Sequence, residues 1–362
     1  MSPMVARAPE RRHTMTARFQ IRSPVMKTSN PSISHKAQPG ETRSAWIEAV
    51  RPRTLPLAAS GSFAAAGLAA ARGHFRWQTL VLMLVVSILL QVIANFADDL
   101  GDLSHGLDDA TRVGPRRGMQ RGIITPAQMK RALIGLSAIT FILGCALICT
   151  ALCHGDPPRC GVVTAIAAFI ALGVAAIAAA ILYTVGPHPY GYAGLGDAAS
   201  FLFFGIVAAC GGTFLYTHAF DPAALVAGIA LGLPVAAVMN INNMRDSLDD
   251  AAKGKRTVAA ALYGLGERGH GISGETAMRI YHAILICGSL ALFLAALFMA
   301  RGVSLGTLVR AAALSVGFQP LLSTLVDVVH EPDHAALDRF MAPTSLGTAI
   351  ATLVFALCTA LG

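Results

Sequence analysis

Long apolar segments separated by short polar ones limit the fold of this sequence more than any other feature. A helix that crosses a lipid bilayer needs about 20 mostly apolar residues. Nine segments meet this requirement, at about 55–72, 77–97, 127–151, 161–184, 193–216, 222–243, 277–300, 304–325 and 344–361. The segment 304–325 has the weakest pattern, because Arg310 and Pro320 interrupt it. The sequence therefore predicts nine transmembrane helices.

The composition supports the same fold class. Hydrophobic residues make up 54% of the 362 residues and charged residues only 13%, whereas soluble domains carry about 25% charged residues. The apolar segments are rich in Ala and Gly, as in AAIAAAI at 175–181, and small residues let helices pack closely in lipid. We expect an all-α polytopic membrane protein, a nine-helix bundle that contacts membrane lipid and has no nucleic-acid partner.

The first 44 residues differ from the rest of the chain. They contain eight Arg and Lys residues against two Glu, which is +6 of the net charge of +8, and they have no apolar run. Such a composition predicts a disordered basic tail over 1–44, followed by a transmembrane domain over 45–362. The tail could be an organellar transit peptide, an arm that lies on anionic lipid, or an over-extended gene start with Met15 or Met26 as the initiator.

The distribution of Lys and Arg predicts the orientation, because cytoplasmic loops carry an excess of these residues. Two loops are strongly basic, at about 100–125 and 245–275, and the N-terminal tail is basic too. These segments should be cytoplasmic, and the C-terminus should lie outside. Four predicted helices separate the two loops, and an even number returns the chain to the same side of the membrane.

An acidic cluster precedes each basic loop, at the end of an apolar segment. The first acidic cluster is NFADDLGD (95–102) and the second is NNMRDSLDD (242–250). The spacing i, i+4 and i+7, which places side chains on one face of a helix, occurs in both clusters. It relates Asn95, Asp99 and Asp102 in the first and Asn242, Asp246 and Asp249 in the second, with Asp250 four residues after Asp246. We expect the two clusters to meet across one cavity.

Acidic residues at these positions could simply cap the helices at the water interface. Negative charge at a helix C-terminus is unfavourable, however, because it opposes the helix dipole. Cations between the carboxylates would remove this cost, and Mg²⁺ prefers one or two carboxylates together with substrate phosphates. The basic stretches GPRRGMQRG (114–122) and KGKRT (253–257) follow the clusters, and Arg can bind phosphate in a bidentate manner. The pattern indicates a site for a diphosphate at the cytoplasmic surface.

Five stretches resemble the UbiA superfamily of intramembrane prenyltransferases, in their order and spacing. They are AWIEAVRPRTLPLA (45–58), NFADDLGD (95–102), GPRRGMQRGIITPAQMKRA (114–132), YTVGPHPYGYAGLGD (183–197) and NNMRDSLDDAAKGKRT (242–257). Within the superfamily, they are similar to the branch that uses 1,4-dihydroxy-2-naphthoate in menaquinone biosynthesis. The resemblance covers about 45–260, and the remainder matches only as hydrophobic segments.

This resemblance implies a Mg²⁺-dependent aromatic polyprenyltransferase in the bacterial cytoplasmic membrane, with its active site toward the cytoplasm. Its substrates would be a polyprenyl diphosphate and 1,4-dihydroxy-2-naphthoate, and its products demethylmenaquinol, CO₂ and diphosphate. A different aromatic acceptor, such as hydroxybenzoate or homogentisate, is one alternative. A cation transporter is a second, although transporter sites usually lie near the middle of the bilayer and these clusters lie at helix ends. The sequence does not indicate the prenyl chain length or the oligomeric state.

The resemblance also implies roles for individual residues. The implied Mg²⁺ ligands are Asn95, Asp98, Asp99 and Asp102 in the first cluster and Asn242, Asp246 and Asp250 in the second, with Asp99, Asp102, Asp246 and Asp250 as the catalytic carboxylates. The implied substrate-binding residues are Arg117, Arg121, Arg245, Lys255, Tyr183, Tyr190 and Asp197. Asp98 departs from the superfamily, in which Asn is common at that position.

The stretch 183–197 lacks Lys and Arg although it lies on the predicted cytoplasmic side. It is therefore a poor phosphate site, and we expect it to form a lid over the aromatic acceptor. Tyr183, Tyr190, Tyr192 and Asp197 are its candidate contacts. Tyr side chains at a membrane interface can also serve as anchors, which is the alternative for each of them.

Overall fold

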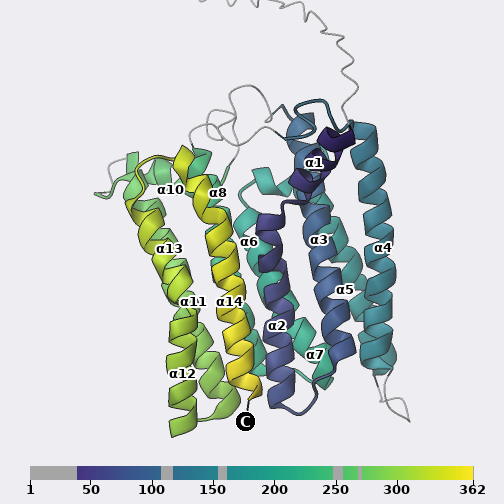
Figure 1. The fold of residues 1–362 in the computed structure, drawn as a ribbon, viewed down its shortest axis with the longest axis vertical. Helices are drawn as coiled ribbons and strands as arrows, with labels where there is room; N and C mark the ends of the chain where they lie inside the picture. The colour runs from purple at the N-terminus through teal and green to yellow at the C-terminus, as the bar shows by residue number, and fades with distance from the viewer. Residues whose placement is uncertain (1–38, 107–116, 154–160, 248–255, 268–270, 362) are drawn as a thin grey trace, which may run out of the picture. The chain divides into compact units, whose positions relative to one another are not determined.

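The computed structural model describes residues 39–106, 117–153, 161–247, 256–267 and 271–361, and these residues form a bundle of long helices (Figure 1). The longer helices are α1 (Pro39–Val50), α2 (Leu55–Ala71), α3 (Trp77–Ser104), α4 (Pro126–Leu152), α5 (Val162–Leu182), α8 (Pro222–Arg245), α10 (Val258–Glu267), α11 (Gly274–Arg301), α12 (Leu305–Gly317), α13 (Gln319–His330) and α14 (Met341–Ala360). The shorter pieces are η1 (Pro52–Thr54), η2 (Tyr190–Tyr192), α6 (Gly196–Ser200), η3 (Phe201–Gly211), α7 (Gly212–Thr217) and η4 (Ala335–Phe340). Within these ranges there is no strand, only an isolated bridge between Ala193 and Arg256.

The predicted membrane spans are confirmed. Eight described helices or continuous helical runs are long and apolar enough to cross a membrane, and the number is nine if the pair α12 and α13, which is bent by 40°, is counted as one span. The bend falls in the segment with the weakest sequence pattern. Pro320 lies in the first turn of α13, where proline is tolerated because the backbone N–H has no helical partner there. The protein is therefore a multi-pass membrane protein.

The predicted boundary of the tail needs a correction. α1 begins at Pro39, so residues 39–44 are helical rather than part of a disordered tail. The predicted disorder of the preceding segment falls on residues 1–38, which lie outside the described residues.

The predicted span 193–216 is observed as one run over Gly196–Thr217, but its middle part, η3, is a π-helix. This segment packs tightly on α8. A Cβ atom on Gly205 would lie 2.5 Å from the carbonyl oxygen of Gly228, so the approach of the two backbones requires glycine. Segments of π-helix are rare and occur often at functional sites, and hydrophobic periodicity does not reveal them.

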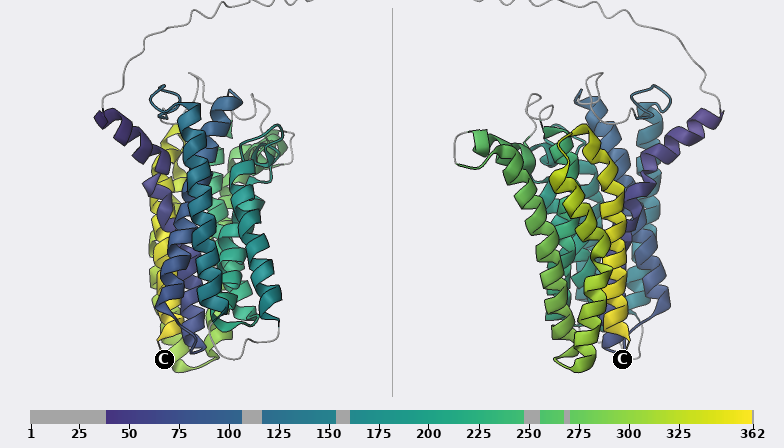
Figure 2. Two further views of the ribbon diagram at one scale, coloured as in Figure 1. Left: turned by 90° about the vertical axis from the view of Figure 1, so that its right-hand side faces the viewer. Right: turned by 60° about the vertical axis from the view of Figure 1, so that its left-hand side comes forward.

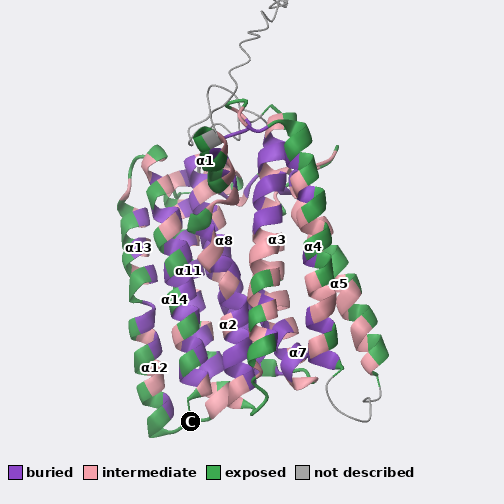
Figure 3. Ribbon diagram, turned by 45° about the vertical axis from the view of Figure 1, so that its right-hand side comes forward, coloured by how far each residue is buried: buried purple, intermediate pink, exposed green. Residues whose placement is uncertain are grey.

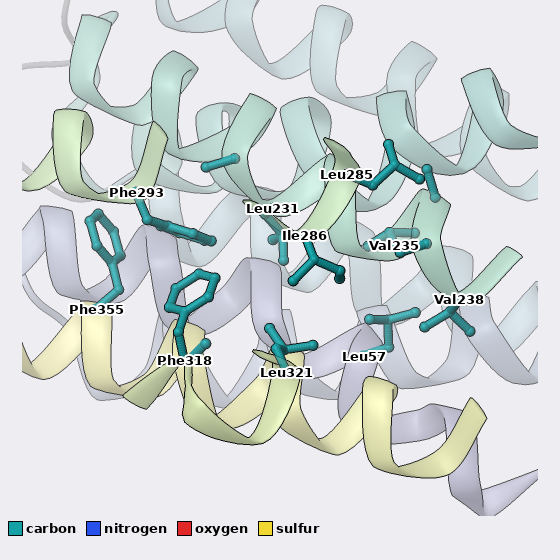
Figure 4. Packing of buried hydrophobic residues seen from close by; sticks show 14 of the residues in the cluster. Leu57, Leu231, Val235, Val238, Leu285, Ile286, Phe293, Phe318, Leu321 and Phe355 are labelled. Carbon is teal, nitrogen blue, oxygen red and sulfur yellow. The ribbon is translucent and has the colours of Figure 1, made fainter. Parts of the chain in front are cut away.

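The core is centred on α8, which packs against α11, η3 and α14. Most of α8 is buried, whereas no residue of α5 is (Figure 3). Aromatic rings of α11, of α14 and of the junction between α12 and α13 complete the core, with Phe293 packed against Phe318 and Phe355 (Figure 4). Because α5 contacts α3 and α4 on the outside of the bundle, its free face is available to lipid.

The two acidic clusters lie at the same end of the bundle. α3 and α8 both run toward the end that carries α1 and α10, while the C-terminal end of α14 lies at the opposite end (Figures 1 and 2). The parity of the predicted spans therefore gives the correct relative placement of the clusters.

Candidate functional site

The first acidic cluster belongs to one continuous helix. α3 continues to Ser104, beyond the predicted end at residue 97, so Asn95, Asp99 and Asp102 do lie at helical spacing. All three are buried, with 4%, 1% and 7% of their surface exposed. A buried carboxylate requires a charged partner or several hydrogen bonds, and the structure provides them.

Two guanidinium groups lie among the carboxylates. The Nη2 of Arg51 donates to Asp98 Oδ2 at 2.6 Å and to Asp99 Oδ1 at 2.7 Å. The Nη1 of Arg117 lies 3.0 Å from Asp99 Oδ1 and 2.9 Å from Asp102 Oδ2, and its Nη2 lies 3.1 Å from Asp98 Oδ2. Arginine thus supplies positive charge between the carboxylates, where the sequence pattern indicated metal ions. Three carboxylates face two guanidinium groups, which leaves one net negative charge.

Arg51 was not predicted as a site residue. Its backbone has φ 53° and ψ 65°, a left-handed conformation that is uncommon for residues other than glycine. The following Pro52 disfavours the right-handed helical conformation at position 51, so α1 ends there and the chain turns. Strained residues of this kind cluster at functional sites. In the sequence, the pair Arg51-Pro52 after α1 is the feature that could have indicated this turn.

Arg117 is held in its charged form. Burial opposes the charge, but the attraction of Asp98, Asp102 and Asp99 outweighs it and raises the pKa of Arg117 above its usual range. Its predicted place at the phosphate site is consistent with this geometry, because the side chain reaches the carboxylates from the loop after α3. The side chain is fixed before any substrate binds.

The second acidic cluster begins at the end of α8. α8 ends at Arg245, and Asp246 is the C-cap residue with φ −97° and ψ 4°. Asp249 and Asp250 lie outside the described residues, so the predicted helical face through them stays a prediction. Arg245 donates to its neighbour Asp246 with bonds of 2.8 and 2.6 Å.

Arg245, predicted to bind substrate, is 4% exposed and is engaged within the protein. It donates to Asn242 Oδ1 at 2.9 Å and forms a close ion pair with Asp338 of η4. Asp338 also pairs with Arg53, with Nη1 and Oδ2 2.8 Å apart. Arg245 thus joins the end of α8 to the segment before α14. Neither Asp338 nor Arg53 was predicted as a site residue, and for Asp338 the reason is that the last 100 residues match the family only as hydrophobic segments.

Both clusters line one cavity of about 290 Å³, as predicted. Its polar lining comes from Arg51, Asn95, Asp98, Asp102, Arg117, Asn242 and Asp246, with Gln91, Thr54, Ser87 and Ser200. Its apolar lining comes from α2, α3, α5, η3 and α8, and includes Leu57, Leu90, Ala176, Phe203, Phe204 and Val235. The acidic residues of the lining lie at the ends of α3 and α8, and most of the apolar lining lies deeper in the bundle. The cavity therefore suits an amphiphile with an anionic head.

The predicted lid, 183–197, supplies two tyrosines to the cavity wall, Tyr183 and Tyr190. Their rings make an edge contact with centroids 5.5 Å apart. The hydroxyl of Tyr190 donates to the carbonyl of Ala179 at 2.7 Å, and burial raises the pKa of Tyr190 to about 12. Both phenols are therefore neutral at physiological pH, since burial also raises the pKa of Tyr183 well above its usual range.

Tyr192 links the lid to the first cluster and to the basic stretch that follows the second. Its hydroxyl donates to Asp102 Oδ1 at 2.7 Å, and its carbonyl accepts the backbone N–H of Arg256 at 2.9 Å. Arg256 follows the second acidic cluster in the chain. Burial and the nearby Asp102 raise the pKa of Tyr192 far above its usual range, so its hydroxyl remains a donor.

Asp197 lies behind the cavity wall. Its Oδ1 accepts from Asn243 Nδ2 and its Oδ2 from the Tyr281 hydroxyl, both at 3.2 Å. It therefore joins the C-terminal end of the lid to α8 and α11, and does not line the cavity.

Of the other predicted basic contacts, Arg121 is not among the residues that line the cavity. Arg121 forms an ion pair with Glu48 of α1, and the side chains of both are well exposed, at 36% and 46%. Lys255 lies outside the described residues. Of the predicted basic residues, Arg117 is the one that the described structure places in the cavity lining.

The oxygen ligands of the cavity fit Mg²⁺ in part. Within the described ranges, no group of three His, Cys, Asp or Glu side chains forms a ready metal-binding arrangement. The carboxylates are instead bonded to Arg51 and Arg117. Mg²⁺ commonly uses one or two carboxylates and completes its shell with water and substrate phosphate. Asn95, Asp98 and Asp102, which line the cavity, fit such an open site.

A bundle of membrane-spanning helices with acidic and basic groups at the mouth of an apolar cavity defines an intramembrane site for an anionic amphiphile. Comparison with known proteins then gives the family. Residues 60–342 match the UbiA prenyltransferase family, and the chain belongs to it.

Characterised relatives extend over most of the chain. The 1,4-dihydroxy-2-naphthoate octaprenyltransferase of Escherichia coli (strain K12) is 38% identical over 314 residues, which are 86% of this chain and 94% of that protein. The protein of the same name from Haemophilus influenzae is 41% identical over 243 residues, covering 67% and 73% of the two chains. The fold also matches the solved structure of a UbiA homolog from Archaeoglobus fulgidus bound to DMAPP and Mg²⁺. The TM-score is 0.50 and the identity 14%, over 84% of this chain and 98% of that one.

Proposed function

We propose that this protein transfers a polyprenyl chain from polyprenyl diphosphate to 1,4-dihydroxy-2-naphthoate, with release of diphosphate and CO₂, in menaquinone biosynthesis. The observation that carries the proposal is the single cavity lined by both acidic clusters, with an apolar interior. The two relatives named above, each at least 38% identical, support the choice of acceptor.

The diphosphate of the donor binds at the polar mouth of the cavity. Arg51 and Arg117 lie there with donor groups on both edges of their guanidinium planes, and such groups bind phosphate oxygens in a bidentate manner. Both also contact Asp98 and Asp99, so that their positions are fixed in advance. Preorganised positive charge stabilises the negative charge that develops on a leaving group.

Asn95, Asp98, Asp102, Asn242 and Asp246 would hold Mg²⁺ together with the diphosphate oxygens. The binding of Mg²⁺ and DMAPP by the Archaeoglobus fulgidus homolog supports the use of a divalent cation. Mg²⁺ bound there would supply Lewis-acid stabilisation of the departing diphosphate. Asp99, at 1% exposure, would act from behind these ligands by orienting Arg51 and Arg117.

The aromatic acceptor binds beneath the lid, against Tyr183 and Tyr190. When the bond between the allylic carbon and the diphosphate oxygen breaks, its electron pair leaves with the diphosphate. The electron-rich ring of the acceptor forms the new carbon–carbon bond to the allylic carbon, and the ring carboxylate leaves as CO₂. The neutral phenols and the apolar walls exclude water, which would otherwise capture the allylic cation.

The protein lies in the bacterial cytoplasmic membrane with the mouth of the cavity toward the cytoplasm. In this orientation the anionic groups of both substrates reach the site from the cytoplasm. The prenyl chain of the donor reaches it from the bilayer. The basic loops beside the two clusters support this orientation.

The proposal is tested with membranes that contain the full chain. They are incubated with a labelled polyprenyl diphosphate, and separately with 1,4-dihydroxy-2-naphthoate, 4-hydroxybenzoate or homogentisate, with Mg²⁺ or with EDTA. We expect a labelled lipid-soluble product only with the naphthoate and only with Mg²⁺, accompanied by one CO₂ per product. Product formed with 4-hydroxybenzoate or homogentisate but not with the naphthoate would contradict the proposed acceptor. Product formed in EDTA would contradict the proposed dependence on Mg²⁺.

A further inference from the structure

Arg245 is shared between a carboxylate that lines the cavity and one that does not. Its Nε and Nη2 donate to Oδ1 and Oδ2 of Asp246 at 2.8 and 2.6 Å, and its Nη1 forms a close ion pair with Asp338 of η4. Asp246 is among the residues that line the cavity, whereas Arg245 and Asp338 are not. The guanidinium group therefore holds a carboxylate of the cavity wall from behind.

The contact with Arg245 occupies both oxygens of Asp246. Among the residues that the structure describes, Arg245 is the cation that pairs with Asp246, and its side chain is only 3% exposed. Asp246 is one of the implied ligands of Mg²⁺, an ion that demands near-ideal geometry from its oxygen ligands. Asp246 must therefore release at least one oxygen from Arg245 before it can bind the ion.

Release of Asp246 has a cost, because Arg245 is buried. Breaking a buried ion pair is strongly unfavourable when the remaining charge has no other partner. The Oδ1 of Asn242, which accepts from Arg245 at 2.9 Å, is neutral. Asp338 is the other carboxylate on this guanidinium group. It therefore determines how easily Arg245 gives up Asp246.

The packing of η4 keeps Asp338 beside Arg245. Leu337 and Phe340, which lie close to Asp338 in this short helix, are both buried. The other partner of Asp338 is Arg53, whose Nη1 donates to Oδ2 at 2.8 Å. That pair is more exposed, with 38% of the Arg53 side chain accessible, and exposed pairs contribute little. Arg245 thus has one fixed carboxylate in η4, and one at the cavity wall.

We infer that Asp338 is a positioning residue for Asp246: by neutralising Arg245, it lets Asp246 turn from the guanidinium group to a cation in the cavity. The inference rests on the proposed function, since it concerns the Mg²⁺ that would bind with the donor diphosphate. Asp338 itself does not touch the ion. The alternative is a purely structural role, in which Asp338 only ties the segment before α14 to the end of α8.

The test measures Mg²⁺ binding without turnover. The full chain in detergent is saturated with farnesyl thiodiphosphate, a donor analogue that resists ionisation, and Mg²⁺ is titrated by calorimetry. In Asp338→Asn, the release of Asp246 leaves Arg245 without a carboxylate. We expect the dissociation constant for Mg²⁺ to rise about tenfold, the scale of one hydrogen bond to a charged group. Arg339→Gln, at the next position of η4, is the matched control, because Arg339 pairs instead with Glu331 and Mg²⁺ binding should be unchanged.

A second comparison separates positioning from a structural role, and it applies even if Asp338→Asn alone does not fold. In Arg245→Met, no guanidinium group holds Asp246. The further change Asp338→Asn should then leave Mg²⁺ binding unaltered, because the two residues act through one contact.

Two results would overturn the inference. One is Mg²⁺ binding by Asp338→Asn that equals that of the wild type. The other is a loss of Mg²⁺ affinity on Asp338→Asn that is as large in the Arg245→Met background as in the wild type, which would indicate an effect independent of Arg245. A wild-type protein that binds no Mg²⁺ in the presence of the analogue would instead refute the metal of the proposed function.

Discussion

At the scale of single residues, the site is a balance between carboxylates and guanidinium groups. Asp98, Asp99 and Asp102 repel one another, and the end of a helix is an unfavourable place for them. Arg51 and Arg117 offset this repulsion with five contacts between 2.6 and 3.1 Å. Any cation that binds the same oxygens must compete with these two side chains. A diphosphate can relieve the competition, because it offers the guanidinium groups alternative partners.

Replacing Arg51 tests this balance. In Arg51→Gln, one guanidinium remains for three carboxylates, and we expect unfolding in detergent to be easier by about 2 kcal/mol, since hydrogen bonds to charged groups contribute about 1.5–3 kcal/mol. Added Mg²⁺ should raise the Tm of this variant more than that of the wild type, because the ion can take the vacated place. The measurement is a thermal melt with and without Mg²⁺.

Arg53→Gln is the control for this melt. Arg53 is near in sequence but pairs with Asp338 at 38% side-chain exposure, and exposed ion pairs contribute about 0–1 kcal/mol. Its melt should respond to Mg²⁺ as the wild type does. An equal response in all three proteins would show that Arg51 does not occupy the place of a cation.

At the scale of elements, the lid 183–197 is the part whose position could be predicted but whose contacts could not. Its lack of Lys and Arg predicts a role other than phosphate binding, and two of its tyrosines line the cavity. Tyr192 bonds to Asp102 and to Arg256, which are far from it in the sequence. The periodicity of apolar residues predicts helices but not such contacts between distant segments. The spacing of the first cluster correctly predicted a helical face, because Asn95, Asp99 and Asp102 all lie on α3. Arg51 was missed because its role depends on a turn.

Tyr190 and Tyr192, two of the three tyrosines of the lid, allow a matched comparison. Tyr192→Phe removes the hydroxyl that donates to Asp102, and we expect kcat/KM for the donor to fall about tenfold, since a hydrogen bond to a charged group contributes about 1.5–3 kcal/mol. Tyr190→Phe removes a hydroxyl that donates to an uncharged group, the backbone carbonyl of Ala179. Its donor kinetics should be nearly unchanged. Equal effects in the two variants would contradict the assigned role of Tyr192.

At the scale of the whole molecule, the account depends on the placement of both clusters at one end of the bundle. Hydropathy and the parity of nine spans were sufficient to predict this placement, because every backbone polar group in a bilayer must be satisfied within a helix. The C-terminal part was predicted only in outline. This part contributes Asp338, which pairs with Arg245 at the end of α8. Asp338 lies in η4, a short turn before α14, and no sequence pattern marks that turn as part of a site.

Labelling from each side of the membrane tests the orientation. Lys130→Cys at the start of α4 and His74→Cys between α2 and α3 lie at exposed positions at opposite ends of the bundle. In a background without the native cysteines, an impermeant maleimide should label His74→Cys in intact cells. It should label Lys130→Cys only after the membrane is opened. The reverse pattern would place the mouth of the cavity outside and contradict the proposed orientation.

The most direct test of the central claim, that the two clusters form one active site, is kcat/KM for the polyprenyl diphosphate in Asp99→Asn, Asp246→Asn and the double variant. Asp99 orients Arg51 and Arg117, and Asp246 lines the opposite wall. We predict that each single change lowers kcat/KM about a hundredfold, or ~2.7 kcal/mol, and that the double change lowers it by less than the product, because residues of one site are coupled. Near-normal rates in either single variant, with a normal melt, would show that its cluster only caps a helix and would contradict the single-site account.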